Sequence, residues 1–139
     1  MSVLLDTGAI FAHLNSSDAR HDEGRGLVHR IASKEFGAPY VSDHVIDELF
    51  TLIRVRTGSA TLEAAAKRFL PMPEPALKGL TLVSLGAGVL EPAWDFFAKY
   101  RDHGISFTDA TLVVTMHELK IERLATLDGR LGKLVKSTG

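Results

Sequence analysis

Short apolar runs alternate along this chain with segments whose apolar residues recur at the period of an α-helix. A compact apolar run that is closed by a turn signal is typical of a buried strand. Strands that alternate with helices favour a parallel sheet covered by helices, and therefore an α/β fold. The runs predict strands at Val3–Leu5, Ala38–Val41, Leu80–Leu85 and Arg123–Leu127.

Helical periodicity predicts the segments between and after these strands. In the second helix, Leu27, Val28 and Ile31 share one face, and Ser17 or Asp18 is the expected N-cap. A proline-rich segment at 71–75 is expected to end the fourth helix, because proline lacks a backbone donor. The expected helices are Ala9–Leu14, Asp18–Lys34, one opened by Ser42 or Asp43, Ser59–Leu70, Val89–Tyr100, Phe107–Leu119 and Arg130–Val135.

Composition narrows the class of protein. The 139 residues predict a single domain, 1–139, that is long enough to bury its own core. No apolar stretch approaches the roughly 18–20 residues that span a bilayer, and the N-terminus lacks a basic leader, so we expect neither a membrane span nor a signal peptide. The absence of cysteine excludes disulfides and zinc–thiolate sites and fits a cytoplasmic protein.

Net charge bears on possible partners. A charge of −1 is not that of a constitutive nucleic-acid binder, which is normally strongly basic. An acidic site can offset basic surface elsewhere in the net charge. A net charge of −1 therefore argues against RNA binding but does not exclude it.

Four acids stand where the predicted elements begin or end: Asp6, Glu48, Asp109 and Asp128. In an α/β protein the carboxyl ends of the strands and the following helix N-termini converge on one crevice. Carboxylates that meet there without a counterion are costly, and a divalent cation would neutralise them. The sequence therefore predicts a candidate metal site, conditional on the four acids meeting.

Each acid also has a structural explanation. Asp6 can cap a helix, and Asp109 occupies the fourth position of the capping box that begins at Ser106. Asp128 before Gly129 can form a turn. Taken singly, these acids are more readily structural, and only their combination favours a site.

Glu48 borders the apolar stripe of its predicted helix, whereas Asp47 points further toward water. The structural alternative for Glu48 is an ion pair with Arg54 or Arg56.

The other candidate residues give weaker signals. The six histidines show no paired metal-binding spacing, so a site built from them is not expected. The aromatic residues near position 97 have helical spacing and are interpreted as core rather than as a base-stacking platform: Trp94, Phe96, Phe97 and Tyr100. Several basic residues could contact phosphates, although each alone is typical of solvated surface: Arg54, Arg56, Lys120, Arg123, Arg130, Lys133 and Lys136.

The motifs LLDTGAIFAHL, SDHVIDELFTLIRVR, SFTDATLVV and ATLD, in this order, resemble those of PIN-domain nucleases. The closest resemblance is to the small ribonucleases that serve as toxins in VapBC toxin–antitoxin pairs, and the segment NSSDARHDEG after the first motif fits it. The chain departs from the pattern by ending soon after Asp128, so a final edge strand is expected to be absent.

The resemblance implies a PIN-like three-layer α/β/α fold with a short central parallel sheet flanked by helices. It implies that the four acids bind Mg²⁺ or Mn²⁺ and act in catalysis, with Thr7, Ser106 and Thr108 as supporting hydroxyls. It further implies an RNA substrate cut to a 5′-phosphate and a 3′-hydroxyl, a homodimer, and a cognate antitoxin that blocks the site. Asp128 is the least secure of the four, since the fourth acid is the most variable in the family.

Other functions compete with a toxin. A non-toxin housekeeping PIN nuclease and a catalytically inactive PIN-like binding module would both keep this fold. A phosphotransfer or receiver-type domain also places an aspartate after its first strand. A phosphatase of that kind would need a second acid two residues later, where this chain has Gly8.

Overall fold

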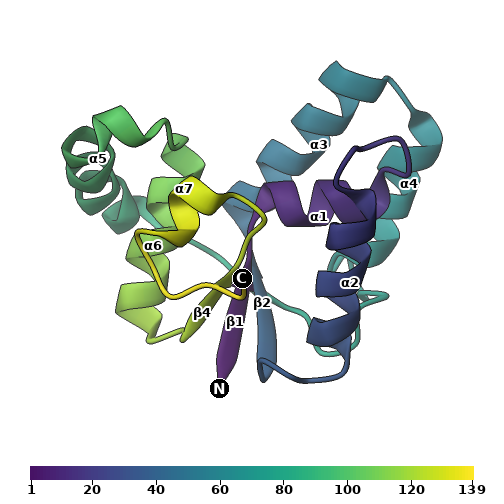
Figure 1. Cartoon of the computed structure of the whole chain (residues 1–139), viewed down its shortest axis with the longest axis horizontal. Helices are drawn as coiled ribbons and strands as arrows, with labels where there is room; N and C mark the ends of the chain where they lie inside the picture. The colour runs from purple at the N-terminus through teal and green to yellow at the C-terminus, as the bar shows by residue number, and fades with distance from the viewer.

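A four-stranded parallel sheet forms the centre of the molecule (Figure 1). The structure is a computed structural model and describes all 139 residues. The strands lie in the order β3-β2-β1-β4, so β1 pairs with both β2 and β4. Their bounds are β1 Ser2–Leu5, β2 Ala38–Ser42, β3 Thr81–Val83 and β4 Arg123–Ala125.

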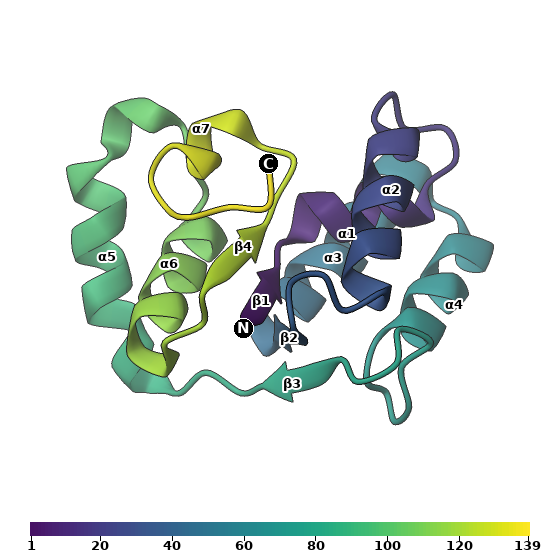
Figure 2. The same ribbon diagram turned by 60° about the horizontal axis from the view of Figure 1, so that its bottom comes forward.

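Helices cover both sides of this sheet, as Figures 1 and 2 show, with α5 and α6 on one side and α1 to α4 on the other. The predicted three-layer α/β/α fold is therefore confirmed. The helices are α1 Thr7–Leu14, α2 His21–Ala32, α3 Asp43–Thr57, α4 Ala60–Phe69, α5 Leu90–Lys99, α6 Phe107–Leu119 and α7 Gly129–Gly132, with 3-10 turns η1 Ala87–Val89 and η2 Arg101–His103. None of them is both long and apolar enough to cross a membrane.

The core forms around β1, whose Val3, Leu4 and Leu5 are almost completely buried. A continuous apolar run suits this position, because a central parallel strand is covered on both faces. Leu49 of α3 and Leu112 of α6 pack into the same core from the helical layers. The sheet thus holds the carboxyl ends of β1 and β4 side by side.

Two strands are shorter than predicted. The expected strand Leu80–Leu85 pairs only over Thr81–Val83, because its partner β2 ends at Ser42 and the Leu85 N–H donates to the Asp43 carboxylate instead. β4 ends at Ala125, two residues before the predicted end, since β1 gives way to α1 at this level. These early ends bring the strand termini next to helix N-termini.

The second helix begins later than predicted. Its first residue is His21, and its N-cap is Arg20, so the expected capping by Ser17 or Asp18 is wrong. The Asp18 carboxylate accepts a bond from the Arg20 N–H at 2.8 Å, which turns the chain before the helix starts.

The C-terminal segment also departs from the expectation. The predicted helix Arg130–Val135 is only the short α7, Gly129–Gly132. The chain then returns along β4: the Leu124 N–H donates to the Lys136 carbonyl, and the Thr138 N–H donates to the Leu124 carbonyl. A single parallel bridge, Leu124 to Ser137, therefore stands in the position of an edge strand.

Trp94 is not a core residue, contrary to the prediction. Its side chain is 56% exposed, because the buried face of α5 passes through Ala93 and the half-buried Phe96. Phe96 and Tyr100 lie with tilted ring planes and centroids 4.5 Å apart, and both are partly buried against the core.

Candidate active site

All four predicted acids line one cavity of about 600 Å³ at the carboxyl edge of the sheet. Asp6 follows β1, Glu48 lies in α3 after β2, Asp109 lies in the first turn of α6, and Asp128 follows β4. We call this space the acidic cavity. The structure therefore brings together, from four separate elements, the side chains that the sequence placed at element ends.

Asp6 is the most deeply buried acid of the cavity, with only 4% of its surface exposed. It caps α1, where its Oδ1 accepts a bond from the Ala9 N–H at 2.8 Å. Burial raises the pKa of Asp6 to about 7, although the Thr126 hydroxyl and the Ala9 N–H oppose the rise. The negative charges of Asp109 and Asp128 raise this pKa further, so a cation beside Asp6 would favour its ionised form.

Asp109 completes a capping box at the start of α6, as the sequence suggested. The Ser106 N–H donates to Asp109 Oδ2 at 2.9 Å, and the Asp109 N–H donates to the Ser106 hydroxyl at 3.0 Å. Burial raises the pKa of Asp109 above its usual value; the bonds from Ser106 oppose this, and the charges of Glu48 and Asp128 add to it. Asp109 therefore caps α6 and also interacts electrostatically with the other acids of the cavity.

Glu48 is half-buried and has neither a hydrogen bond nor an ion pair within the protein. The alternative partner Arg54 instead binds Glu63, through bonds of 2.7 and 3.1 Å. Arg56 lies over the Phe11 ring at 6.0 Å. The ion-pair explanation of Glu48 is therefore wrong, and its carboxylate faces the acidic cavity without a counterion.

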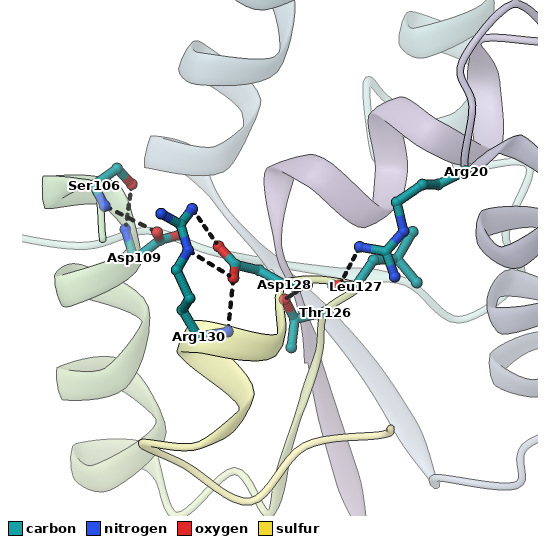
Figure 3. A network of polar contacts seen from close by, with 7 residues as sticks. All are labelled: Arg20, Ser106, Asp109, Thr126, Leu127, Asp128 and Arg130. Carbon is teal, nitrogen blue, oxygen red and sulfur yellow. Dashed lines mark hydrogen bonds and ion pairs between the residues drawn. The ribbon is translucent and has the colours of Figure 1, made fainter. Parts of the chain in front are cut away.

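Asp128 caps the short α7 and pairs with the arginine two residues later (Figure 3). Its Oδ1 accepts from the Arg130 N–H at 2.9 Å and from Nε at 3.3 Å, while Oδ2 lies 3.3 Å from Nη2. Burial alone would raise the pKa of Asp128, but the bonds and charge of Arg130 outweigh it and lower the pKa. Asp128 is thus the one acid of the cavity that already has a cationic partner.

The three predicted supporting hydroxyls differ in placement. Thr7 is buried at the wall of the acidic cavity, and its Oγ1 has no hydrogen-bond partner. Ser106 also lines the cavity and forms the capping box. Thr108 does not line the cavity. The Thr7 hydroxyl is therefore a buried polar group that the chain itself leaves without a hydrogen-bond partner.

Three arginines at the cavity provide positive charge: Arg20, Arg56 and Arg130. Two of them were among the basic residues singled out in the sequence, whereas Arg20 was missed. Arg20 lies in the segment before α2 and donates to the Leu127 carbonyl (Figure 3). It also pairs with Glu23 at 2.7 Å. Its place two residues after Asp18, just before the helix, was the only available signal.

The donor set of the acidic cavity fits a hard divalent cation. Asp6 and Asp109 each use one carboxylate oxygen for capping, and Glu48 uses neither of its own, so free oxygens remain as ligands. As now arranged, no group of three or more acids or histidines is able to hold an ion. The metal centre stays a prediction.

A parallel α/β sheet whose carboxyl edge carries four acids defines a recognisable class of protein. The PIN domain model matches residues 3–136, nearly the whole chain, and the chain belongs to the PIN domain family. The resemblance inferred from the ordered motifs is thereby confirmed.

Within this family the chain is similar to VapC proteins. It is 28% identical to a VapC ribonuclease of Archaeoglobus fulgidus over 132 residues, covering 94% of this chain and 79% of that protein. It is also 28% identical to the 23S rRNA-specific endonuclease VapC20 of Mycobacterium tuberculosis, covering 91% and 89% of the two chains. The crystal structure of that VapC20, described as a sarcin–ricin loop cleaving toxin, matches with a TM-score of 0.78 at 25% identity, covering 95% and 94%.

Proposed function

We propose that this chain is a divalent-metal-dependent ribonuclease that cleaves RNA internally by hydrolysing phosphodiester bonds, and that it is the toxin of a toxin–antitoxin pair. The observation that supports it most strongly is the acidic cavity, where carboxylates from four elements meet and where burial, with a smaller contribution from neighbouring acids, raises the pKa values of Asp6 and Asp109. Such crowding destabilises the empty protein, so a site of this kind is best explained by a bound cation. The names of the VapC relatives support RNA as the substrate class.

The proposed ligands are Asp6, Glu48, Asp109 and Asp128, with Mg²⁺ or Mn²⁺ as the ion. When bound, the ion activates a water and stabilises charge on the leaving oxygen. Positioning of the ligands and binding of the RNA depend on the protein's own residues.

Asp6 and Asp109 are held by their capping bonds in fixed positions, which reduces the entropy lost when the site forms. Thr7 is proposed to support the site from the cavity wall, where its buried Oγ1 has no hydrogen-bond partner within the chain.

The arginines of the cavity are proposed to bind the RNA backbone. A guanidinium matches the geometry of a phosphate, and it stays charged at every physiological pH. Arg20, Arg56 and Arg130 come from three separate segments around the acids. Basic groups around an acidic centre would hold a polyanion while the scissile phosphate approaches the metal, which explains how a chain of net charge −1 can act on RNA.

Three further proposals concern partners and place of action. A cognate antitoxin would block the acidic cavity, as the similarity to VapC proteins suggests. We also propose a homodimer, supported by exposed apolar residues on the edge strand β3, on α5 and at the end of α6: Leu82, Leu90, Trp94 and Leu119. Acting on RNA, the protein would work in the cytoplasm.

RNA cleavage by matched variants tests the proposal. With Mg²⁺ or Mn²⁺ present, Asp6→Asn, Glu48→Gln and Asp109→Asn are each expected to reduce cleavage on the order of 100-fold or more, because each removes charge stabilisation from the reacting centre. Asp47→Asn is the control, since Asp47 neighbours Glu48 but is exposed. Wild-type cleavage by the three folded variants would contradict the mechanism. A wild-type protein that binds no Mn²⁺ would instead favour a non-catalytic PIN-like module.

A further inference from the structure

The Arg130 guanidinium lies between the side chains of Asp109 and Asp128 (Figure 3), and Arg130 lines the acidic cavity. It contacts both carboxylate oxygens of Asp128, and the charge of Asp109 also acts on it. The guanidinium also passes close to the Gly104 backbone, where an added Cβ would lie 2.7 Å from Nη1. The guanidinium therefore occupies a defined place beside two of the proposed metal ligands.

This ion pair is suited to exchange rather than to permanent structure. Its two side-chain contacts are both 3.3 Å, longer than the roughly 2.7–2.9 Å of a strong charge-assisted bond. The Arg130 side chain is 64% exposed, so water can replace these contacts. The backbone N–H of Arg130 donates independently to Asp128 Oδ1 at 2.9 Å, so the turn does not depend on the guanidinium.

A divalent cation and the Arg130 guanidinium compete for the same carboxylate. A cation and a guanidinium that both contact Asp128 would repel each other, because two positive charges would lie within a few ångströms. The guanidinium is on a long exposed side chain, whereas the carboxylate is fixed by its capping bond. Metal loading would therefore displace the arginine, not the acid.

We infer that Arg130 is an exchangeable counterion. It neutralises Asp128 in the metal-free protein and, once displaced, binds a phosphate of the RNA next to the loaded centre. This inference rests on the proposed function, and it adds a coupling between metal loading and RNA binding through one side chain. Arg130 is thus a substrate-binding residue that also keeps the empty acidic cavity stable.

Arg130→Gln separates the two roles, because the inference predicts that this variant binds Mn²⁺ more tightly and RNA more weakly. Calorimetric titration without RNA is expected to show Mn²⁺ binding that is tighter by roughly three- to tenfold, since a competing positive charge has gone. Lys133→Gln removes the same charge from the same segment but lies outside the acidic cavity, and is expected to leave Mn²⁺ affinity unchanged. Arg130→Lys keeps the positive charge but lacks the planar guanidinium. Its Mn²⁺ affinity is expected to lie between those of the wild type and Arg130→Gln.

Fluorescence anisotropy with a short labelled single-stranded RNA, in Ca²⁺ to limit turnover, measures the second role. Arg130→Gln is expected to weaken binding several-fold and to reduce the slope of log affinity against log salt by about 0.7, the value for one lost phosphate contact. Weaker or unchanged Mn²⁺ binding by Arg130→Gln, or an unchanged salt slope, would overturn the inference while leaving the ribonuclease proposal intact. Absence of Mn²⁺ binding by the wild-type protein would overturn both.

Discussion

Asp6 illustrates how one side chain serves both the fold and the site. An N-cap requires only an oxygen acceptor, and asparagine caps as well as aspartate. The negative charge of Asp6 is therefore not needed for the bond to the Ala9 N–H. It is costly in a residue that is 4% exposed, and only the proposed metal centre makes use of it.

Asp6→Asn is consequently expected to stabilise the metal-free protein at alkaline pH. The pKa of Asp6 is about 7 in the folded state, above its value of 3.8 in model compounds. Between these values the folded state holds a proton that the unfolded state releases, so this group's contribution to stability is lost as pH rises from about 4 to about 7. We expect Asp6→Asn to gain about 2–4 kcal/mol over wild type at pH 8 in EDTA.

Urea unfolding of both proteins at pH 5 and pH 8 measures this difference. It should shrink markedly at pH 5, where Asp6 of the wild type is mostly protonated in the folded state. A difference that is equal at the two pH values would show that the Asp6 charge is not costly.

At the scale of the elements, residues that cap helices also fix the positions of side chains in the site. Ser106 begins α6 and holds Asp109 in the capping box, so the start of this helix and the position of a proposed ligand depend on the same pair of bonds. Ser59 begins α4 through an equivalent bond to the Leu62 N–H, but lies outside the acidic cavity.

Ser106→Ala and Ser59→Ala form a matched pair. Each is expected to destabilise the protein by about 1 kcal/mol in urea unfolding, as for the loss of an N-cap. Only Ser106→Ala is expected to reduce RNA cleavage, by about tenfold, because a ligand that is no longer fixed lies off its productive position. Equal losses of cleavage in both variants would mean that α6 capping has no particular role in the site.

Three elements present exposed apolar side chains that the chain itself does not cover. β3 is an edge strand, and Leu82 on it is exposed, as are Trp94 on α5 and Leu119 at the end of α6. An open strand edge beside exposed apolar residues favours association with another chain.

Trp94→Glu combined with Leu119→Glu is expected to convert the proposed dimer into a monomer, since buried charges without partners are costly in an interface. Light scattering coupled to size-exclusion chromatography measures the mass directly. Val55→Glu is the control, because Val55 is even more exposed but lies on α3. A double variant that still elutes as a dimer would place the interface elsewhere.

At the scale of the whole molecule, the sequence predicted the layers and the convergence of the acids but not the details of the element ends. Apolar runs such as Val3–Leu5 are local signals, and they located all four strands. The ends of β3 and β4 depend on where the neighbouring strand stops, which no local pattern contains. Trp94 was misassigned for a related reason: helical spacing identifies a face, but the neighbouring layer determines which face is buried.

In the candidate site, too, local sequence predicted some features, whereas others depend on contacts between distant residues. Glu48 was correctly placed at the edge of the core, and Asp109 was correctly placed in a capping box. Arg20 was missed because its contact with the Leu127 carbonyl joins residues that are 107 positions apart. The pairing of Arg54 with Glu63, which leaves Glu48 without a counterion, likewise depends on how α3 packs against α4.

The central claim is that the four acids share a divalent cation. Anomalous diffraction from crystals soaked in Mn²⁺ tests it most directly, because manganese is then located without reference to activity. We predict an anomalous peak within the acidic cavity, with oxygen atoms of Asp6 and at least two of the other three acids in its coordination sphere. A well-occupied peak elsewhere, or none in the cavity at saturating Mn²⁺, would contradict the account.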